Sequence, residues 1–155
     1  MTIEFSDETF MKAALTEAEA AGDKGEVPVG AVVVCNNRII ARAHNLTETL
    51  NDPTAHAEMQ AITAASTYLG GKYLDKCSLY VTLEPCTMCA GALFWCRIGK
   101  LVYGTADEKR GYSLNKNRVL HKKTLVSGGV MESECRNIIK DFFKTRRQDL
   151  SDEIN

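Results

Sequence analysis

Strand-like and helix-like segments alternate along most of the chain, and this alternation restricts the folds that are open to it. Two short apolar runs flank the pair Asn36-Asn37, which favours a tight hairpin because asparagine tolerates a positive φ. Further apolar runs at 78–83 and 100–104 lie between segments with helical spacing. Strands that alternate with helices predict a sheet covered on both faces. We therefore expect an α/β protein, a three-layer α/β/α sandwich with a mixed sheet of about five strands.

The same patterns place the helices. A first helix is expected from the N-cap Ser6 to about Ala21, with Phe5 and Phe10 spaced for a hydrophobic staple across its start. Others are expected to begin near Ala55 and Pro85 and to close the chain over 132–148. The closing helix is amphipathic, and the apolar residues that we expect on its inner side are Ile138, Ile139, Phe142 and Phe143.

Length and composition favour one domain. A chain of 155 residues can bury a core without cross-links, and 45% hydrophobic and 25% charged residues are typical of a globular protein. We expect a single domain over 1–155 with a flexible tail after about 149. The N-terminal segment lacks an apolar signal-like region, and the longest apolar run, 27–35, is far shorter than the ~20 residues of a membrane span. These features predict a cytoplasmic protein with no membrane association.

The net charge of −1 conceals an uneven distribution. Residues 1–26 carry seven acidic residues and two lysines, whereas residues 107–147 carry eleven basic and five acidic residues. A basic surface raises the local concentration of a polyanion, so the second segment points weakly to nucleic acid. From charge alone, a solvated helix face and a basic loop are the simpler interpretation.

Cys86 and Cys89, in the segment LEPCTMCAG, are three positions apart behind a proline. This spacing fits a redox couple, half of a four-thiolate structural zinc site, or two of three ligands of a reactive metal. A redox couple usually carries Gly-Pro or Pro-His between its thiols, where this chain has Thr87-Met88. A four-thiolate site needs a second close pair, and no other two cysteines are closer than seven positions. The cysteines expected in the core are Cys35, Cys77, Cys96 and Cys135.

A reactive metal site needs one more ligand, and His56 is the candidate, because Glu58 follows it at the start of a predicted helix. Residues two apart on a helix point to different sides, so His56 would bind the metal while Glu58 works beside it. One nitrogen and two thiolates leave the fourth position of a tetrahedral zinc ion for water, whose pKa the ion lowers from 15.7 toward ~7. One Zn²⁺ per chain is therefore the expected cofactor. His44 and His121 are expected to be ordinary polar residues.

The order His-x-Glu, then Pro-Cys-x-x-Cys after a strand, is a known signature of zinc-dependent nucleobase deaminases. The chain resembles the cytidine deaminase-like superfamily, and within it most resembles the bacterial tRNA-specific adenosine deaminases. The similar segments are 26–34, 44–58, 79–92, 97–104 and 142–148. The resemblance implies the cytidine deaminase-like fold, a homodimer, and a hydrolase that acts on an amidine C–N bond. Its reaction would convert adenosine to inosine in the anticodon loop of tRNA, at the wobble position, and release ammonia.

The resemblance also assigns roles. His56, Cys86 and Cys89 would bind the zinc, and Glu58 would be the catalytic proton shuttle. Asn45 would bond to the base, Val29 would line the pocket under it, and Asp107 would touch the substrate strand. Without the resemblance, these last three are an asparagine at a strand end, a strand valine and a turn aspartate.

Phe142 and Arg146 have two interpretations. The aromatic residues of the closing helix are most simply core residues. In the family this helix also walls the substrate groove, where an aromatic edge and arginines suit unstacked bases and phosphates. The resemblance therefore adds Phe142 and Arg146 to the expected substrate contacts.

Two departures from the family leave the substrate open. The loop 110–123 is shorter than in the tRNA enzymes and has His121-Lys122 where they carry Asn-His. Phe94-Trp95 is an aromatic pair of the kind found in guanine deaminases of the superfamily. The alternatives are a deaminase of a free base, such as guanine or cytosine, and a zinc-stabilised RNA-binding module. Glu58 disfavours the last, since a structural metal site has no use for a carboxylate beside it.

Overall fold

One mixed five-stranded sheet organises the computed structural model, which describes residues 5–154; residues 1–4 and 155, the ends of the predicted domain 1–155, lie outside the described part. The strand order is β2-β1-β3-β4-β5. The strands are β1 Gly30–Cys35, β2 Arg38–His44, β3 Cys77–Leu83, β4 Lys100–Thr105 and β5 Leu125–Gly128. The helices are α1 Asp7–Asp23, α2 Ala57–Leu69, α3 Thr87–Trp95 and α4 Glu132–Ile154.

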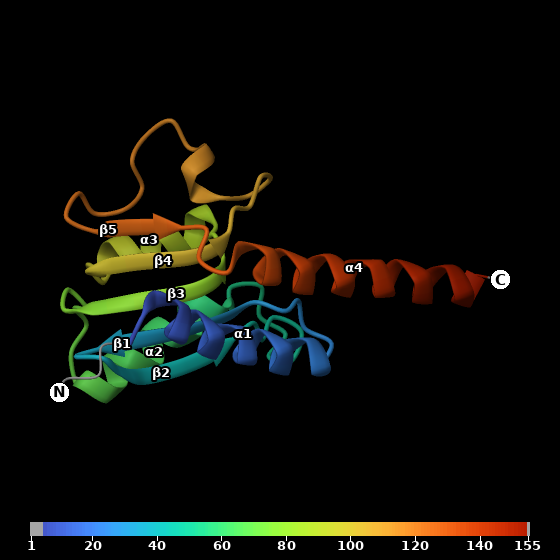
Figure 1. Cartoon of the computed structure of the whole chain (residues 1–155), viewed down its shortest axis with the longest axis horizontal. Coiled ribbons are helices and arrows are strands. Elements are labelled where there is room, and N and C mark those ends of the chain that lie inside the picture. The colour runs from blue at the N-terminus through green and yellow to red at the C-terminus, as the bar shows by residue number, and fades with distance from the viewer. Residues whose placement is uncertain (1–4, 155) are drawn as a thin grey trace.

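Helices cover both faces of this sheet, with α1 and the start of α4 on one face and α2 and α3 on the other (Figure 1). β1 is antiparallel to both β2 and β3, whereas β3, β4 and β5 are parallel. Asn36 and Asn37 turn the β1–β2 hairpin with φ of 51° and 59°, the left-handed conformation that such a tight turn requires. The predicted three-layer α/β/α sandwich and its hairpin are confirmed.

The two faces of the sheet are packed with residues of different size. On the α1 face, Phe10 and Met11 pack against Val32 and Tyr80. On the other face, the buried side of α2 consists mainly of alanines, which pack against β-branched and leucine side chains of the sheet. Small residues let the α2 backbone lie close to the strands, so the start of α2 is held at a fixed place beside the sheet.

The start of α1 follows the prediction. The Ser6 side chain accepts a hydrogen bond from the Thr9 N–H at 3.3 Å, and the rings of Phe5 and Phe10 are 5.9 Å apart. Asp7 then ties the helix to the sheet, because its carboxylate accepts the Tyr80 hydroxyl at 2.7 Å and Lys100 Nζ at 3.1 Å. The expected N-cap and staple are both present.

The closing helix differs from its prediction. α4 projects from the body of the protein (Figure 1), and Cys135 is its one buried residue among those described. Ile138, Ile139 and Phe142 are half-buried among exposed neighbours, so they lie on the inner side as expected, whereas Phe143 is 40% exposed and its expected inner position is wrong. The predicted flexible tail lies in the last turns of this helix, which continues to Ile154. No helix within 5–154 is both long and apolar enough to span a membrane.

At Gly30, the backbone of α1 lies directly against strand β1. A Cβ at this position would overlap the Ala14 carbonyl oxygen and the Ala18 amide nitrogen. We expect Gly30→Ala to lower the free energy of unfolding by about 2 kcal/mol or more, because backbone atoms cannot move aside as a side-chain tip can. Thermal denaturation measures the effect. Gly71→Ala is the matched control, since a Cβ there meets nothing within 4 Å, and equal melting temperatures for both variants would contradict the close approach.

Candidate active site

Two helix starts meet at one end of the sheet and carry the expected metal-binding groups. His56 is the N-cap of α2 and Cys86 is the N-cap of α3, and neither side chain caps its own helix. Both side chains can therefore turn toward one another. Cys89 lies three residues after Cys86, on the same side of α3. The positive ends of two helix dipoles also favour thiolate over thiol at this place.

The three groups converge closely. His56 Nδ1 lies 3.6 Å from Cys86 Sγ and 3.5 Å from Cys89 Sγ, and the three candidate ligand atoms are all within 4.8 Å of one another. No fourth histidine, cysteine or acidic side chain joins this group in the described chain. His44 instead bonds to Glu17 at 2.9 Å. One nitrogen and two sulfur donors, with one position left open, fit a catalytic zinc ion.

The pKa values of the two thiols shift in opposite directions. Hydrogen bonds from Cys89 and His56 lower the pKa of the Cys86 thiol to about 4. The bond to Cys86 raises the pKa of Cys89, and the same partner raises the pKa of His56 above its usual value. A thiolate and an imidazolium thus form readily side by side. A bound cation would go further, since a coordinating thiol is deprotonated outright.

Glu58 lies beside this group in the first turn of α2, and it is only 4% exposed. Burial raises the pKa of its carboxyl group to about 7. A carboxyl group with such a pKa can both accept and donate a proton near neutral pH, which is what general acid–base chemistry requires.

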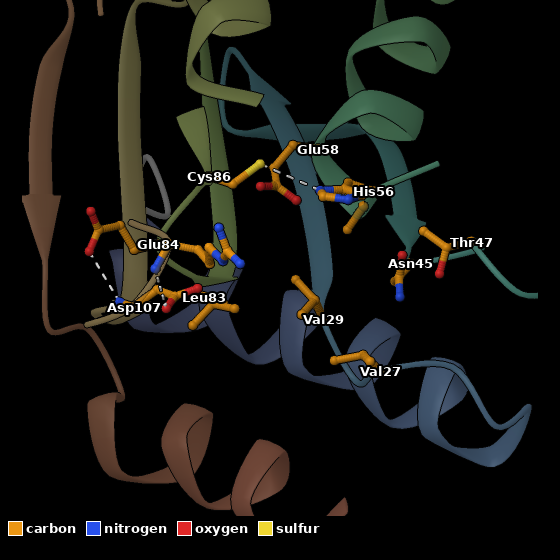
Figure 2. Close-up of a pocket in the computed structure, with 12 residues that line it drawn as sticks. Val27, Val29, Asn45, Thr47, His56, Glu58, Leu83, Glu84, Cys86 and Asp107 are labelled. Carbon is orange, nitrogen blue, oxygen red and sulfur yellow. Dashed lines mark hydrogen bonds between the residues drawn. The ribbon is translucent and has the colours of Figure 1, made fainter. Parts of the chain in front are cut away.

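A cavity of about 430 Å³ opens onto these groups, within the usual size range of small-molecule sites. Figure 2 shows His56, Cys86 and Glu58 above Val29, which lies lower in the pocket. Asn45 lies on one side of the pocket.

Asp107 lies on the opposite side (Figure 2). The structure therefore brings together Val29, Asn45 and Asp107, three of the substrate-contacting residues expected from the sequence. Their roles toward a substrate stay predictions.

Other expected residues lie elsewhere. Phe142 and Arg146 are not among the residues that line the cavity, and the Arg146 guanidinium lies over the Phe142 ring at 5.3 Å. Phe94 and Trp95 lie at the end of α3 and also stay off the cavity wall. The contact of α4 with a substrate remains a prediction, and the aromatic pair of α3 does not shape this pocket.

Several pocket residues had no individual sequence-based prediction, although Arg110 belongs to the basic segment 107–147 that points weakly to nucleic acid. Glu84 and Arg110 line the cavity, as do Val27, Thr47 and Leu83. Glu84 directly precedes the Pro-Cys-x-x-Cys motif, and Arg110 follows Asp107 by three residues. Their closeness to predicted site residues is the one sequence feature that could have identified them. Nothing in the residue types themselves distinguishes them from ordinary surface residues.

Comparison with known proteins agrees with this geometry. A family model described as MafB19-like deaminase matches residues 5–147. A tRNA-specific adenosine deaminase of Bacillus subtilis (strain 168) is 49% identical over 148 residues, which are 92% of this chain and 91% of the relative.

Solved structures are similar as well. A tRNA:A34 deaminase, from a study of A-to-I editing at the wobble position of transfer RNA, is 46% identical, with a TM-score of 0.79 over 83% of this chain and 97% of that chain. A guanine deaminase from Bacillus subtilis is 44% identical, with a TM-score of 0.63 over 66% of each chain. The identity and the share of both chains that is matched show that this chain belongs to the MafB19-like deaminases, and among them to the tRNA-specific adenosine deaminases.

Proposed function

We propose that this protein is a zinc-dependent hydrolytic deaminase that converts adenosine to inosine at the tRNA wobble position and releases ammonia. The observation that carries the proposal is the convergence of a histidine, two cysteines and a buried carboxylate on one pocket, in a chain of the tRNA-specific adenosine deaminase family. The proposal includes a cytoplasmic location, which the bacterial tRNA-specific relatives support.

His56, Cys86 and Cys89 would hold one zinc ion per chain. The ion supplies a Lewis acid that lowers the pKa of a water molecule from 15.7 to ~7. The protein would contribute three ligands, which leaves room for a water molecule, and the buried carboxylate of Glu58 beside them. Any other divalent ion that prefers sulfur and nitrogen ligands would compete for the same site.

Glu58 moves the protons of the reaction. Water adds to C6 of the adenine ring, and Glu58 accepts a proton from it and passes this proton to ring N1. Glu58 then transfers the second proton of the added oxygen to the amino group. The C6–N bond breaks, and ammonia leaves. The balance is adenosine and water to inosine and ammonia, with Glu58 returned to its starting state.

Asn45 and Val29 would hold the base. The backbone N–H of Asn45 donates to the Val29 carbonyl at 3.1 Å, whereas its side-chain amide has no hydrogen bond to another described residue, so this side chain is available to a ligand in the pocket that it lines. Val29 offers an apolar surface below the metal-binding group (Figure 2). One polar contact and one apolar surface suffice to orient a flat purine ring.

A free base such as guanine is the second candidate, supported by the 44% identity of the guanine deaminase noted above. Two features favour RNA instead. Arg110 brings a positive charge to the cavity wall, and the basic loop that follows it continues the charge away from the pocket. A free neutral base needs neither, whereas a nucleotide strand carries phosphates on both sides of the reacting base.

The proposal includes a homodimer formed through α3. Trp95 is 77% exposed, and its ring stacks edge-on against Phe94 with centroids 5.2 Å apart. Met88 is exposed on the same helix. An exposed cluster of large apolar side chains is typical of a protein–protein contact.

Replacement of Glu58 tests the chemistry. We expect Glu58→Gln to bind zinc at one ion per chain and to lose about 10³-fold or more in deamination rate, because only the proton transfer is removed. Zinc is measured by atomic absorption and activity by ammonia release. Glu19→Gln, on the exposed side of α1, is the matched control. Full activity in Glu58→Gln would remove the proposed proton shuttle.

The substrate is tested by a direct comparison. We expect ammonia release from an adenosine-34 anticodon stem-loop and none from free adenine, guanine or cytosine. The logarithm of the binding constant for the stem-loop should fall linearly with the logarithm of salt concentration, because contacts to phosphates release counterions. Turnover of guanine without turnover of the stem-loop would replace the first candidate by the second.

The dimer is tested by Trp95→Glu. A charge at the centre of an apolar contact should dissociate it, so light scattering should give about 34 kDa for the wild type and about half that mass for the variant, given 17.1 kDa per chain. Leu150→Glu, on the projecting part of α4, is the control and should leave the mass unchanged. A wild-type mass of one chain would contradict the proposal.

A further inference from the structure

Two loops form opposite sides of the pocket, and each is fastened to the body of the protein by one buried glutamate. We propose that Glu26 and Glu84 are positioning residues, which hold the loops 45–50 and 105–113 so that Asn45 and Asp107 face one another across the pocket. The inference rests on the proposed deaminase function of that pocket. Neither glutamate is assigned a part in the proton transfer.

Glu26 holds the loop 45–50. It is 0% exposed, and its two oxygens accept the N–H groups of Glu48 and Thr49 at 2.9 and 2.8 Å. Its own N–H donates to the Ala21 carbonyl at 3.0 Å, so the end of α1 fixes its position. Burial alone would raise the pKa of Glu26, but the N–H donors of Thr49 and Glu48 hold it below its usual value. The ionised carboxylate of Glu26 is therefore the form that accepts both N–H groups of the loop.

Glu84 holds the loop 105–113 in the same way. It is 2% exposed, and its two oxygens accept the N–H groups of Asp107 at 3.1 Å and Ser113 at 3.0 Å. Gly111 makes room for the carboxylate, because a Cβ there would overlap its atoms. Glu84 lies between the end of β3 and Cys86 in the sequence. Its bonds to the loop 105–113 therefore connect this loop to the segment that carries Cys86.

The contacts that fix the loop 105–113 also include side chains that line the pocket. Asp107 Oδ1 accepts the N–H groups of Lys109 and Arg110 at 3.1 and 3.0 Å. Arg110 lines the cavity, so the chain of contacts leads from Glu84 through Asp107 to the one cationic side chain on the pocket wall among the described residues. A shift of the loop would move both charges relative to the base.

Glutamine is the informative substitution at both positions. It has the shape of glutamate but only one acceptor oxygen, and its NH₂ group would face a backbone N–H donor. One hydrogen bond is lost and two donors are forced together, so the loop must move. Aspartate keeps both acceptor oxygens on a shorter side chain, which makes it the conservative variant.

The first readout is independent of activity. In the wild-type protein, the amide hydrogens of Glu48, Thr49, Asp107 and Ser113 should exchange slowly with solvent. Glu26→Gln should speed exchange in 46–50 only, and Glu84→Gln in 105–113 only. Gly111→Ala keeps Glu84 but pushes its carboxylate aside, because the added Cβ would overlap the carboxylate atoms. This variant should therefore speed exchange in 105–113 as Glu84→Gln does. Unchanged exchange in these variants would overturn the proposal, whatever the enzyme's substrate proves to be.

The second readout separates positioning from simple stability. With zinc still at one ion per chain and the variants folded at the assay temperature, we expect kcat/KM for the stem-loop to fall about 10²-fold, the scale of a misplaced contact. Glu84→Asp should recover part of the loss. Glu19→Gln is again the control. A kcat/KM equal to that of the wild type, or a loss that follows zinc content alone, would show that the glutamates only stabilise the fold.

Discussion

The close approach of one imidazole and two thiols is the constraint on which the rest of the structure depends. His56 and Cys86 are 30 positions apart in sequence, and the chain holds the His56 Nδ1 and Cys86 Sγ atoms 3.6 Å apart by fixing the starts of two helices. The strand order does this. α2 follows β2 and α3 follows β3, and β1 lies between these strands and pairs with both. The alanine side of α2 and the hydrophobic face of the sheet then keep the two helix starts in register.

Much of this was predictable because it depends on local patterns. The Asn36-Asn37 turn and the Ser6 cap are each determined by a few neighbouring residues. The ligand group was predictable because metal chemistry restricts residue type and spacing together. α4 could not be placed in the same way, because its amphipathic pattern shows that one side is apolar but not what covers that side. α4 projects from the body of the protein (Figure 1), and Cys135 is its one buried residue among those described.

Glu26 and Glu84 were missed for a different reason. A glutamate in a loop is usually solvated, and its residue type does not indicate that it is buried. Both residues bond to backbone N–H groups, which every non-proline residue carries, so no complementary side chain marks the partner. The two loops are distant in sequence, and only the folded chain shows that they lie on opposite sides of the pocket. Positions that organise a site through the backbone are therefore the least visible from sequence.

The size of the pocket limits where selection of the substrate can take place. A cavity of about 430 Å³ can hold one nucleoside but not an anticodon loop, so the rest of an RNA must lie outside it. Inside the pocket the charged residues are mainly acidic, namely Glu58, Glu84 and Asp107, with Arg110 as the counterweight. The exposed side chain of Arg110 is therefore the group on the cavity wall that would attract a phosphate. On the proposed function, the group of His56, Cys86 and Cys89 would serve the removal of the amine, whereas Arg110 and the loop that Glu84 holds would bear on whether the base arrives free or as part of a strand.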